Sequence, residues 1–232
     1  MLDRFLLLCQ RLIKLNDGLQ TGLWLAVIVS GLYHGLSPGM GWPLAVAAGL
    51  SEKRGAAVAA ALVPLAAGHF AAMAVVLLPF ALLAAVSDHS SGIRIGAGLL
   101  VVGFGLYRLF DRRHPRALAR IRPTQLALWS FLVAIAHGAG FLLIPVYLGL
   151  DQAAGHAMHG GMPQPAGNSF VSALIVSAIH TLAMIAAGGG IAWLVYKYLG
   201  LQFLTKSWFN LELVWALSLI AAGAAGLWTA LP

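Results

Sequence analysis

The stretch YHGLSPGMGWPLAV, from Tyr33 to Val46, interrupts a long apolar run with one histidine, three glycines and two prolines. Proline lacks an amide donor and its ring clashes with the preceding helical turn, so Pro38 and Pro43 do not fit together into one regular helix. Irregular backbone at membrane depth is tolerated only where it is buried in protein or lines a cavity. The stretch therefore predicts a broken membrane helix whose freed backbone groups can coordinate an ion; a simple kink is the alternative.

The composition is that of a membrane protein. Of the 232 residues, 60% are hydrophobic and only 9% are charged, more apolar than a soluble domain of this size needs to be. About 20 apolar residues per helix are required to cross the hydrocarbon. We therefore expect an all-α integral membrane protein, in contact with the lipid bilayer, with six transmembrane helices. The six predicted spans are Thr21–Leu50, Ala56–Val86, Ile93–Phe110, Gln125–Leu150, Phe170–Tyr198 and Leu211–Leu231.

The net charge of +7 has a local cause and does not call for a nucleic-acid partner. Arginines gather in and beside residues 111–124, which predicts a basic cytoplasmic loop by the positive-inside rule. Alternating from this loop places both termini outside, in what we expect to be a bacterial inner (plasma) membrane. Residues 1–20 lack the long apolar core of a signal peptide and predict an amphipathic helix at the membrane interface. Cys9 is the only cysteine, so an intramolecular disulfide or dithiol relay is excluded.

Residues 21–110 and 125–232 carry matching landmarks. His34 and His137 are each followed by a glycine and, nine or eight residues later, by a proline. The second predicted span of each half then reads GHFAAM or IHTLAM. With three helices per half, the second half enters the membrane from the opposite side, which predicts two inverted three-helix repeats with the working site where they meet. Coincidence in a chain rich in Ala, Gly and Leu is the alternative.

Four histidines fall inside the predicted spans, where ionisable groups usually face the bundle interior and are functional. Two of them are followed at i+4 by a methionine, so that each His/Met pair shares one helix face. Imidazole and thioether together favour copper(I) or late transition metals. The alternative is hydrogen-bonded core histidines and methionines that fill gaps. The predicted metal ligands are His34, Met40, His69, Met73, His137, His180 and Met184.

Further histidines and methionines lie outside the predicted spans. The loop 151–168 contains His156, Met158, His159 and Met162, and a mobile His/Met-rich loop on the outer face is suited to capture or release a soft metal. His89 lies in the other outer loop. A polar linker with incidental histidines is the alternative. Acidic residues are almost absent from the spans, with only Glu212 at an edge, so a site for a hard divalent cation has no buried carboxylates.

The HGLSP motif at His34–Pro38, on a broken first helix with a Gly-His motif in the second, resembles the LysE-type exporter superfamily. It is most similar to the nickel/cobalt transporter and urease-accessory branch. The resemblance implies a six-helix protein with two inverted three-helix repeats, and metal transport as its activity. Where that branch continues with Asp-His, this chain has Gly39 and Met40. The exchange removes a carboxylate and replaces an imidazole by a thioether, which shifts the expected cargo toward copper(I). The related thiol-relay branch needs a cysteine pair that this chain lacks.

We therefore expect a transporter or exporter of a transition-metal ion, copper or nickel/cobalt, in which histidine protonation couples metal release to proton entry. One alternative is a membrane redox protein with histidines as axial haem ligands. Another is an accessory subunit of a larger membrane complex, or a homo-oligomer, docked through the Gly/Ala-rich third and sixth helices. An enzyme is not expected, since Ser37 lies near His34 without a partner carboxylate at membrane depth. ATP-driven transport by this chain alone is not expected either, because the sequence has no phosphate-binding glycine loop.

Overall fold

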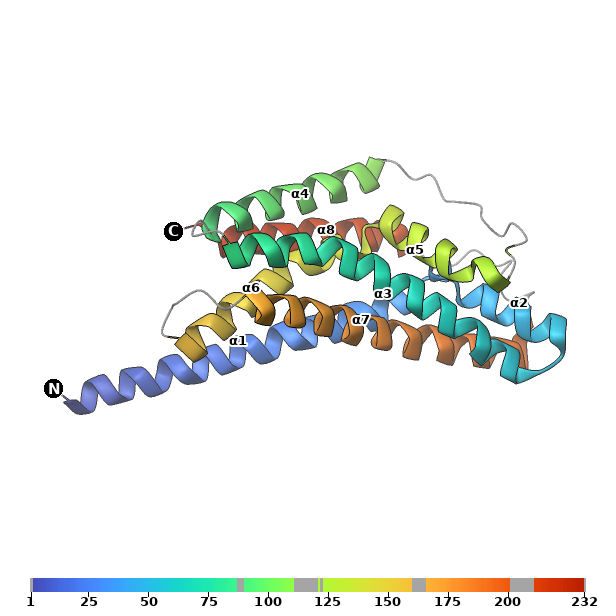
Figure 1. The fold of residues 1–232 in the computed structure, drawn as a ribbon, viewed down its shortest axis with the longest axis horizontal. Helices are drawn as coiled ribbons and strands as arrows, with labels where there is room; N and C mark the ends of the chain where they lie inside the picture. Colours follow the sequence, from blue (N-terminus) through green and yellow to red (C-terminus); the bar gives the residue numbers. More distant parts are fainter. Residues whose placement is uncertain are drawn as a thin grey trace.

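The computed structural model describes residues 2–86, 90–110, 121, 123–159, 166–200 and 211–231, and within these ranges all regular structure is helical. The helices run roughly along the long axis of the molecule (Figure 1). The main helices are α1 (Leu2–Leu36), α2 (Trp42–Glu52), α3 (Gly55–Val86), α4 (Ser90–Phe110), α5 (Leu126–His137), α6 (Ala139–His159), α7 (Ala166–Leu194) and α8 (Leu211–Trp228). Short helical turns are η1 (Pro38–Met40), η2 (Pro123–Gln125) and η3 (Val195–Leu199).

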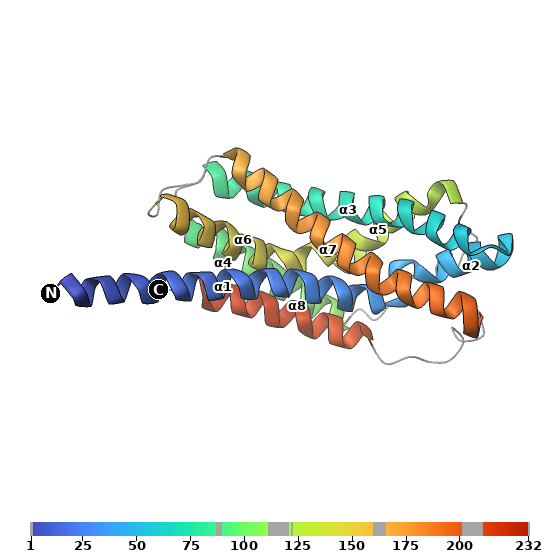
Figure 2. The same cartoon turned by 90° about the horizontal axis from the view of Figure 1, so that it is seen from below.

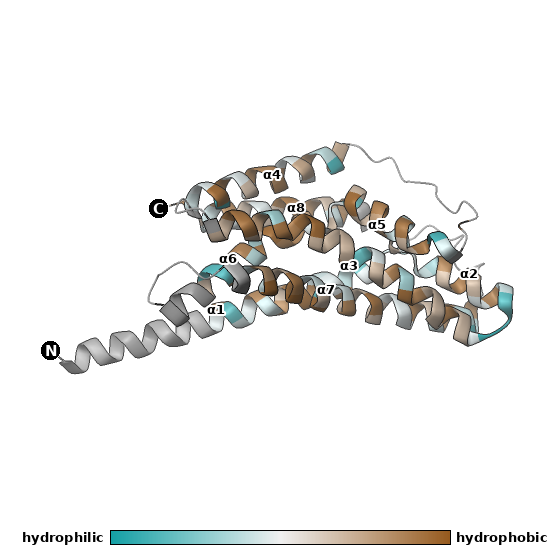
Figure 3. Ribbon diagram, in the orientation of Figure 1, coloured by the Kyte–Doolittle hydropathy of each residue, from teal (hydrophilic) through white to brown (hydrophobic). Residues whose placement is uncertain are grey.

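Within the described ranges, four helices are long and apolar enough to cross a membrane. They are Gly18–Leu36, Gly55–Ala85, Ser91–Phe110 and Ser169–Leu199. The bent pair α5 and α6 passes the same test together, which makes up to five spans. Large apolar side chains remain exposed on these helices, as expected of faces turned toward lipid, and apolar residues dominate the helices in Figure 3. The all-helical fold is confirmed and is consistent with a membrane-spanning chain; six spans and the inverted repeat stay predictions.

The first predicted span is broken, at the stretch that the prolines and glycines indicated. Helix α1 ends at Leu36, turn η1 follows, and Gly41 adopts φ 96° before α2 begins. Glycine suits this left-handed conformation because it has no Cβ, and a Cβ at Gly41 would overlap the side chains of Leu65 and Trp129. Pro43 lies in the first turn of α2, where its missing amide removes no helical hydrogen bond.

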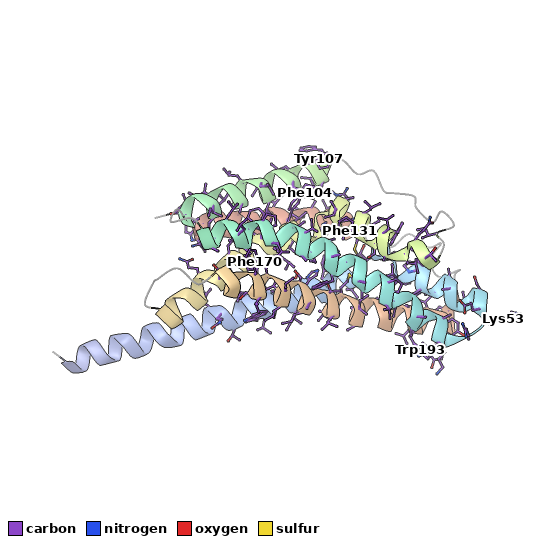
Figure 4. The ribbon with its side chains drawn as sticks, viewed as in Figure 1. Lys53, Phe104, Tyr107, Phe131, Phe170 and Trp193 are labelled. Atoms are coloured by element: carbon purple, nitrogen blue, oxygen red, sulfur yellow. The ribbon has the colours of Figure 1, made fainter. Side chains whose placement is uncertain are left out.

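A second break separates α5 from α6 and consists of a single residue, Gly138. Gly138 adopts φ 71° between the two helices, which are bent by 68° relative to one another. The ring of Phe104 on α4 (Figure 4) lies against Gly138 where a Cβ would stand. Each break therefore follows a half-helix that carries a histidine in its last turn, His34 in α1 and His137 in α5.

Glycines bring the helices of the two predicted halves into close contact. Helices α1 and α7 cross and contact one another (Figure 2). A Cβ at Gly31 or Gly35 would overlap the backbone of α7, at His180 or Met184 respectively. Gly68 of α3 lies equally close to the backbone of α5. Small residues permit such approach between membrane helices, and here they set the distance between the elements that carry the histidines.

Charged groups lie toward the two ends of the molecule. At the α2–α3 turn, where Figure 4 labels Lys53, Arg54 forms an ion pair of 2.6 Å with Glu52. At the other end, Arg94 of α4 donates to the side chains of Gln152 and Thr229, and so ties α4 to α6 and to the end of α8.

Several predictions fall on residues that the structure describes only as backbone or not at all. Residues 2–20 are helical and continuous with the rest of α1, and their location at a membrane interface stays a prediction. Residues 111–120 and 122, most of the predicted basic loop, lie outside the described residues. So do the side chains of His89, His156, Met158, His159, Met162 and Glu212.

Candidate functional site

Three buried histidines from three helices meet beside the first break. His34 comes from the end of α1, His69 from α3 and His180 from α7. Their ring centroids are 5.2 Å apart for His34 and His69, 5.7 Å for His34 and His180, and 5.6 Å for His69 and His180. Exposed fractions of 2%, 1% and 0% show that none of the rings reaches the surface. We call these three residues the histidine triad.

The triad contains polar atoms that the protein itself does not satisfy. The Nε2 atoms of His34, His69 and His180 are buried and have no hydrogen-bond partner. The hydroxyl of Thr181, the residue after His180, is buried without a partner as well. Most buried polar atoms in proteins are hydrogen-bonded, and leaving one unsatisfied costs roughly 1–3 kcal/mol. Such a concentration of unpaired nitrogen and oxygen atoms indicates a place for a ligand.

The hydrogen bonds of Ser30 fix the proton position of His180. The single hydroxyl proton of Ser30 is donated to the carbonyl of Val27 at 2.9 Å. Ser30 Oγ, 3.2 Å from His180 Nδ1, therefore accepts a proton from this nitrogen, and the Nε2 atom of neutral His180 carries a lone pair. Metal-binding histidines are commonly held in this way, with the second ring nitrogen donating to a neighbouring oxygen. The unpartnered Nε2 is thus the nitrogen available to a cation.

The triad has the ring spacing of a metal site. Three imidazoles that share one ion at about 2 Å have ring centres roughly 5 Å apart, close to the separations of 5.2, 5.6 and 5.7 Å found here. Even so, no group of three or more His, Cys, Asp or Glu side chains in the described part of the chain is arranged as a formed metal site.

His137, the fourth predicted ligand, lies at the second break. Its Nδ1 atom donates to the carbonyl of Val133 at 3.2 Å, so that its Nε2 atom carries the lone pair. The ring faces turn η1, and its Nε2 atom lies 3.4 Å from the position that a Cβ of Gly39 would occupy. The two breaks thus touch one another through His137 and Gly39.

Trp215 of α8 was not predicted as part of the site. Its ring is buried, with its centroid 4.5 Å from that of His34, and its Nε1–H donates to the carbonyl of His137 at 2.8 Å. Trp215 therefore connects the ends of α1 and α5. An aromatic residue in an apolar span gives no signal in the sequence. The polar residues of α7 do give one, because His180 and Thr181 follow Ser177 at spacings of three and four residues, and all three are buried.

The structure separates the three predicted methionine ligands. Met40 and Met184 pack together with Val133 in one small buried cluster. Met73 is also fully buried but lies in the large hydrophobic core with Val27 and Leu77. The i+4 spacing from histidine is the same for Met73 and Met184, so the spacing alone does not decide which methionine lies near the breaks.

The best-defined carboxylate within the candidate spans lies away from the triad. Asp151 of α6 accepts a hydrogen bond of 2.9 Å from Ser169, whose carbonyl accepts one of 3.1 Å from Tyr147. Ser169 precedes His180 on α7 by 11 residues, or about 16 Å of helix. Among the residues with described side chains, no Asp or Glu is fully buried. The donors around the breaks are therefore neutral nitrogen, sulfur and hydroxyl groups.

No family model, curated protein or solved structure matches this chain. The chemistry of the residues around the two breaks therefore supplies the argument for function.

Proposed function

We propose that this protein carries a transition-metal cation, copper or nickel/cobalt, across a membrane, with the histidine triad as its central binding site. One observation carries the proposal. Three buried Nε2 atoms without hydrogen-bond partners belong to rings 5.2–5.7 Å apart, at the contact between helices from the two predicted halves. Neutral imidazole is a ligand of late transition metals.

The ends of the broken helices add to the attraction for a cation. Helices α1 and α5 each end next to a buried histidine, and the carboxyl end of a helix carries a partial negative charge. Broken membrane helices that direct such ends at a central site are used by transporters to hold cations. The carboxyl ends of α1 and α5 thus place partial negative charge beside His34 and His137.

Ligands from both halves provide a way to release the ion. His34 and His69 belong to residues 21–110, whereas His180 belongs to residues 125–232. A rocking motion of one half against the other changes the distances between His180 and the other two rings. The ion would then lose the nitrogen of His180 as a ligand and could leave the site. Alternating access of this kind is the usual consequence of a binding site between repeats, and it agrees with the resemblance to LysE-type exporters.

Haem ligation fits this geometry less well. A porphyrin has to lie between its two axial histidines, but each pair of triad rings has the third ring only 5.2–5.7 Å away. Inserting the macrocycle would require one histidine to leave the cluster. A single ion requires only that the rings turn.

The test is metal binding and transport by the purified protein. We expect detergent-solubilised protein to retain copper, nickel or cobalt, and proteoliposomes to take up the same metal. His34→Ala and His180→Ala should each remove both activities. Tyr147→Phe is the matched control, since it removes a buried polar group from the distant Asp151 region. A protein that binds and moves none of these metals overturns the proposal. A Soret band that is lost in His180→Ala would establish the haem alternative instead. A purified protein that contains neither metal nor haem would favour the accessory-subunit alternative.

A further inference from the structure

We infer that Met40 and Met184 form a thioether station beside the histidine triad, and that this station selects a soft monovalent cation, copper(I) or its analogue silver(I). The inference rests on the proposed function, because it assigns the cargo of that same path. It distinguishes Met40 and Met184 from Met73, which the sequence grouped with them.

The station is built from the same elements that hold the triad. Met184 follows His180 on α7 by four residues, about 6 Å of helix. Met40 lies in turn η1, directly after the end of α1 that carries His34. Both methionines are nearly inaccessible, with exposed fractions of 5% and 2%. They pack together with Val133, and Trp129 and Ile185 close the cluster.

His137 places a nitrogen donor at the edge of this station. Its Nδ1–H is held by the carbonyl of Val133, which belongs to the cluster. Its Nε2 atom lies against Gly39, the residue before Met40. An ion that leaves the triad along α7 thus meets two thioethers and one imidazole. Thioether sulfur is a soft, neutral ligand that favours copper(I) over harder divalent ions.

Met73 shows what a structural methionine looks like in this molecule. It has the same i+4 relation to His69 that Met184 has to His180, and it is completely buried. It belongs, however, to the large hydrophobic core, together with Val27, Leu77 and Leu143, and not to the small cluster of Met40 and Met184. Met73 therefore fills space, whereas Met40 and Met184 meet where the helices are broken.

The experiment compares silver(I) and cobalt(II) uptake into proteoliposomes, because silver(I) mimics copper(I) without redox chemistry. The double variant Met40→Leu/Met184→Leu removes both sulfur atoms at nearly constant volume, and Met73→Leu is the matched control. We expect the double variant to lower silver(I) uptake at least about tenfold and to leave cobalt(II) uptake within about twofold. Met73→Leu should change neither.

The outcomes separate the station from the proposed function. If the double variant takes up silver(I) like the wild type, while His180→Ala takes up none, the station is wrong and the triad stands. Equal losses of silver(I) and cobalt(II) would show that the two methionines serve packing, and thermal unfolding followed by circular dichroism would reveal that defect directly. A wild type that moves cobalt(II) but not silver(I) overturns the station alone. A wild type that moves neither overturns both.

Discussion

The two helix breaks follow the same local pattern but serve different purposes. Each comes directly after a histidine in the last turn of a half-helix, and each contains a glycine with positive φ. The first break contains turn η1 and leaves the Nε2 atom of His34 unpaired within the triad. The second consists of Gly138, and the carbonyl of the neighbouring His137 is bound by Trp215.

The difference shows that the same His-Gly motif can stand in two different structural settings. The first break has room for Met40 and brings His34 against His69 and His180. The second break turns His137 toward η1, so that it borders the first break and supports it. The surroundings of His34 and His137 therefore differ, although the motif that they share is the same.

Replacing the glycine that follows each histidine should give the largest difference in stability between the two breaks. In Gly35→Ala, the new methyl group would overlap the backbone carbonyl of Met184, which cannot move without displacing α7. We expect a loss of roughly 3 kcal/mol in stability, since overpacking a well-packed contact costs about this much. Gly138→Ala should cost less, about 1–2 kcal/mol for the left-handed backbone, because the new methyl group would overlap the ring of Phe104, a side chain that can turn aside without moving a helix. Chemical unfolding in detergent measures both; an equal effect would contradict the comparison.

Removing the histidines themselves should show which break binds the metal. His34→Ala deletes one of the three proposed ligands, and we expect the affinity for the proposed cargo metal to fall about 100-fold or more, equivalent to about 2.7 kcal/mol. His137→Ala should lower it by about tenfold or less, because His137 belongs to the neighbouring station. Equilibrium dialysis with metal analysis gives both values. A larger loss for His137→Ala would move the primary site to the second break.

Replacing Ser30, which is hydrogen-bonded to His180, should have a smaller effect on metal affinity. Ser30→Ala removes the oxygen that accepts the Nδ1 proton, and losing such a partner typically lowers metal affinity about 10- to 100-fold. The same substitution at Ser218, which bonds only within α8, is the control and should have no effect. Unchanged affinity in Ser30→Ala would mean that the tautomer of His180 is set by another group.

Trp215 should have the smallest effect. Trp215→Phe keeps an aromatic ring near His34 but removes the donor to the carbonyl of His137. We expect a loss of about 1 kcal/mol in stability, the usual net value of one hydrogen bond, with metal affinity nearly unchanged. A loss of affinity without a loss of stability would make Trp215 part of the binding site itself.

Local chemistry explains which parts of this arrangement could be predicted. Pro38 and Pro43 with their neighbouring glycines predicted the first break, because these residues act within a few positions of themselves. Gly138 gave a weaker signal, and the 68° bend that it permits was not predicted. The ring contacts among His34, His69 and His180 agree with the expectation that membrane histidines face the interior. The functions of Ser30 and Trp215 and the separation of Met73 from Met184 depend on tertiary contacts between distant helices, which no local spacing encodes.

The contact between α1 and α7 also determines when the site can exist. Ser30 and His180 are 150 residues apart in the chain, and the ribosome delivers the first residues to the membrane long before the last. While the nascent protein is being inserted, His34 and His69 are synthesised before His180. Helix α7, against which Gly31 and Gly35 pack, does not yet exist. A chain cut short before α7 therefore has no triad. Under the proposed function, metal loading would follow completion of synthesis, so a half-made protein would have no closed site in which to trap the ion.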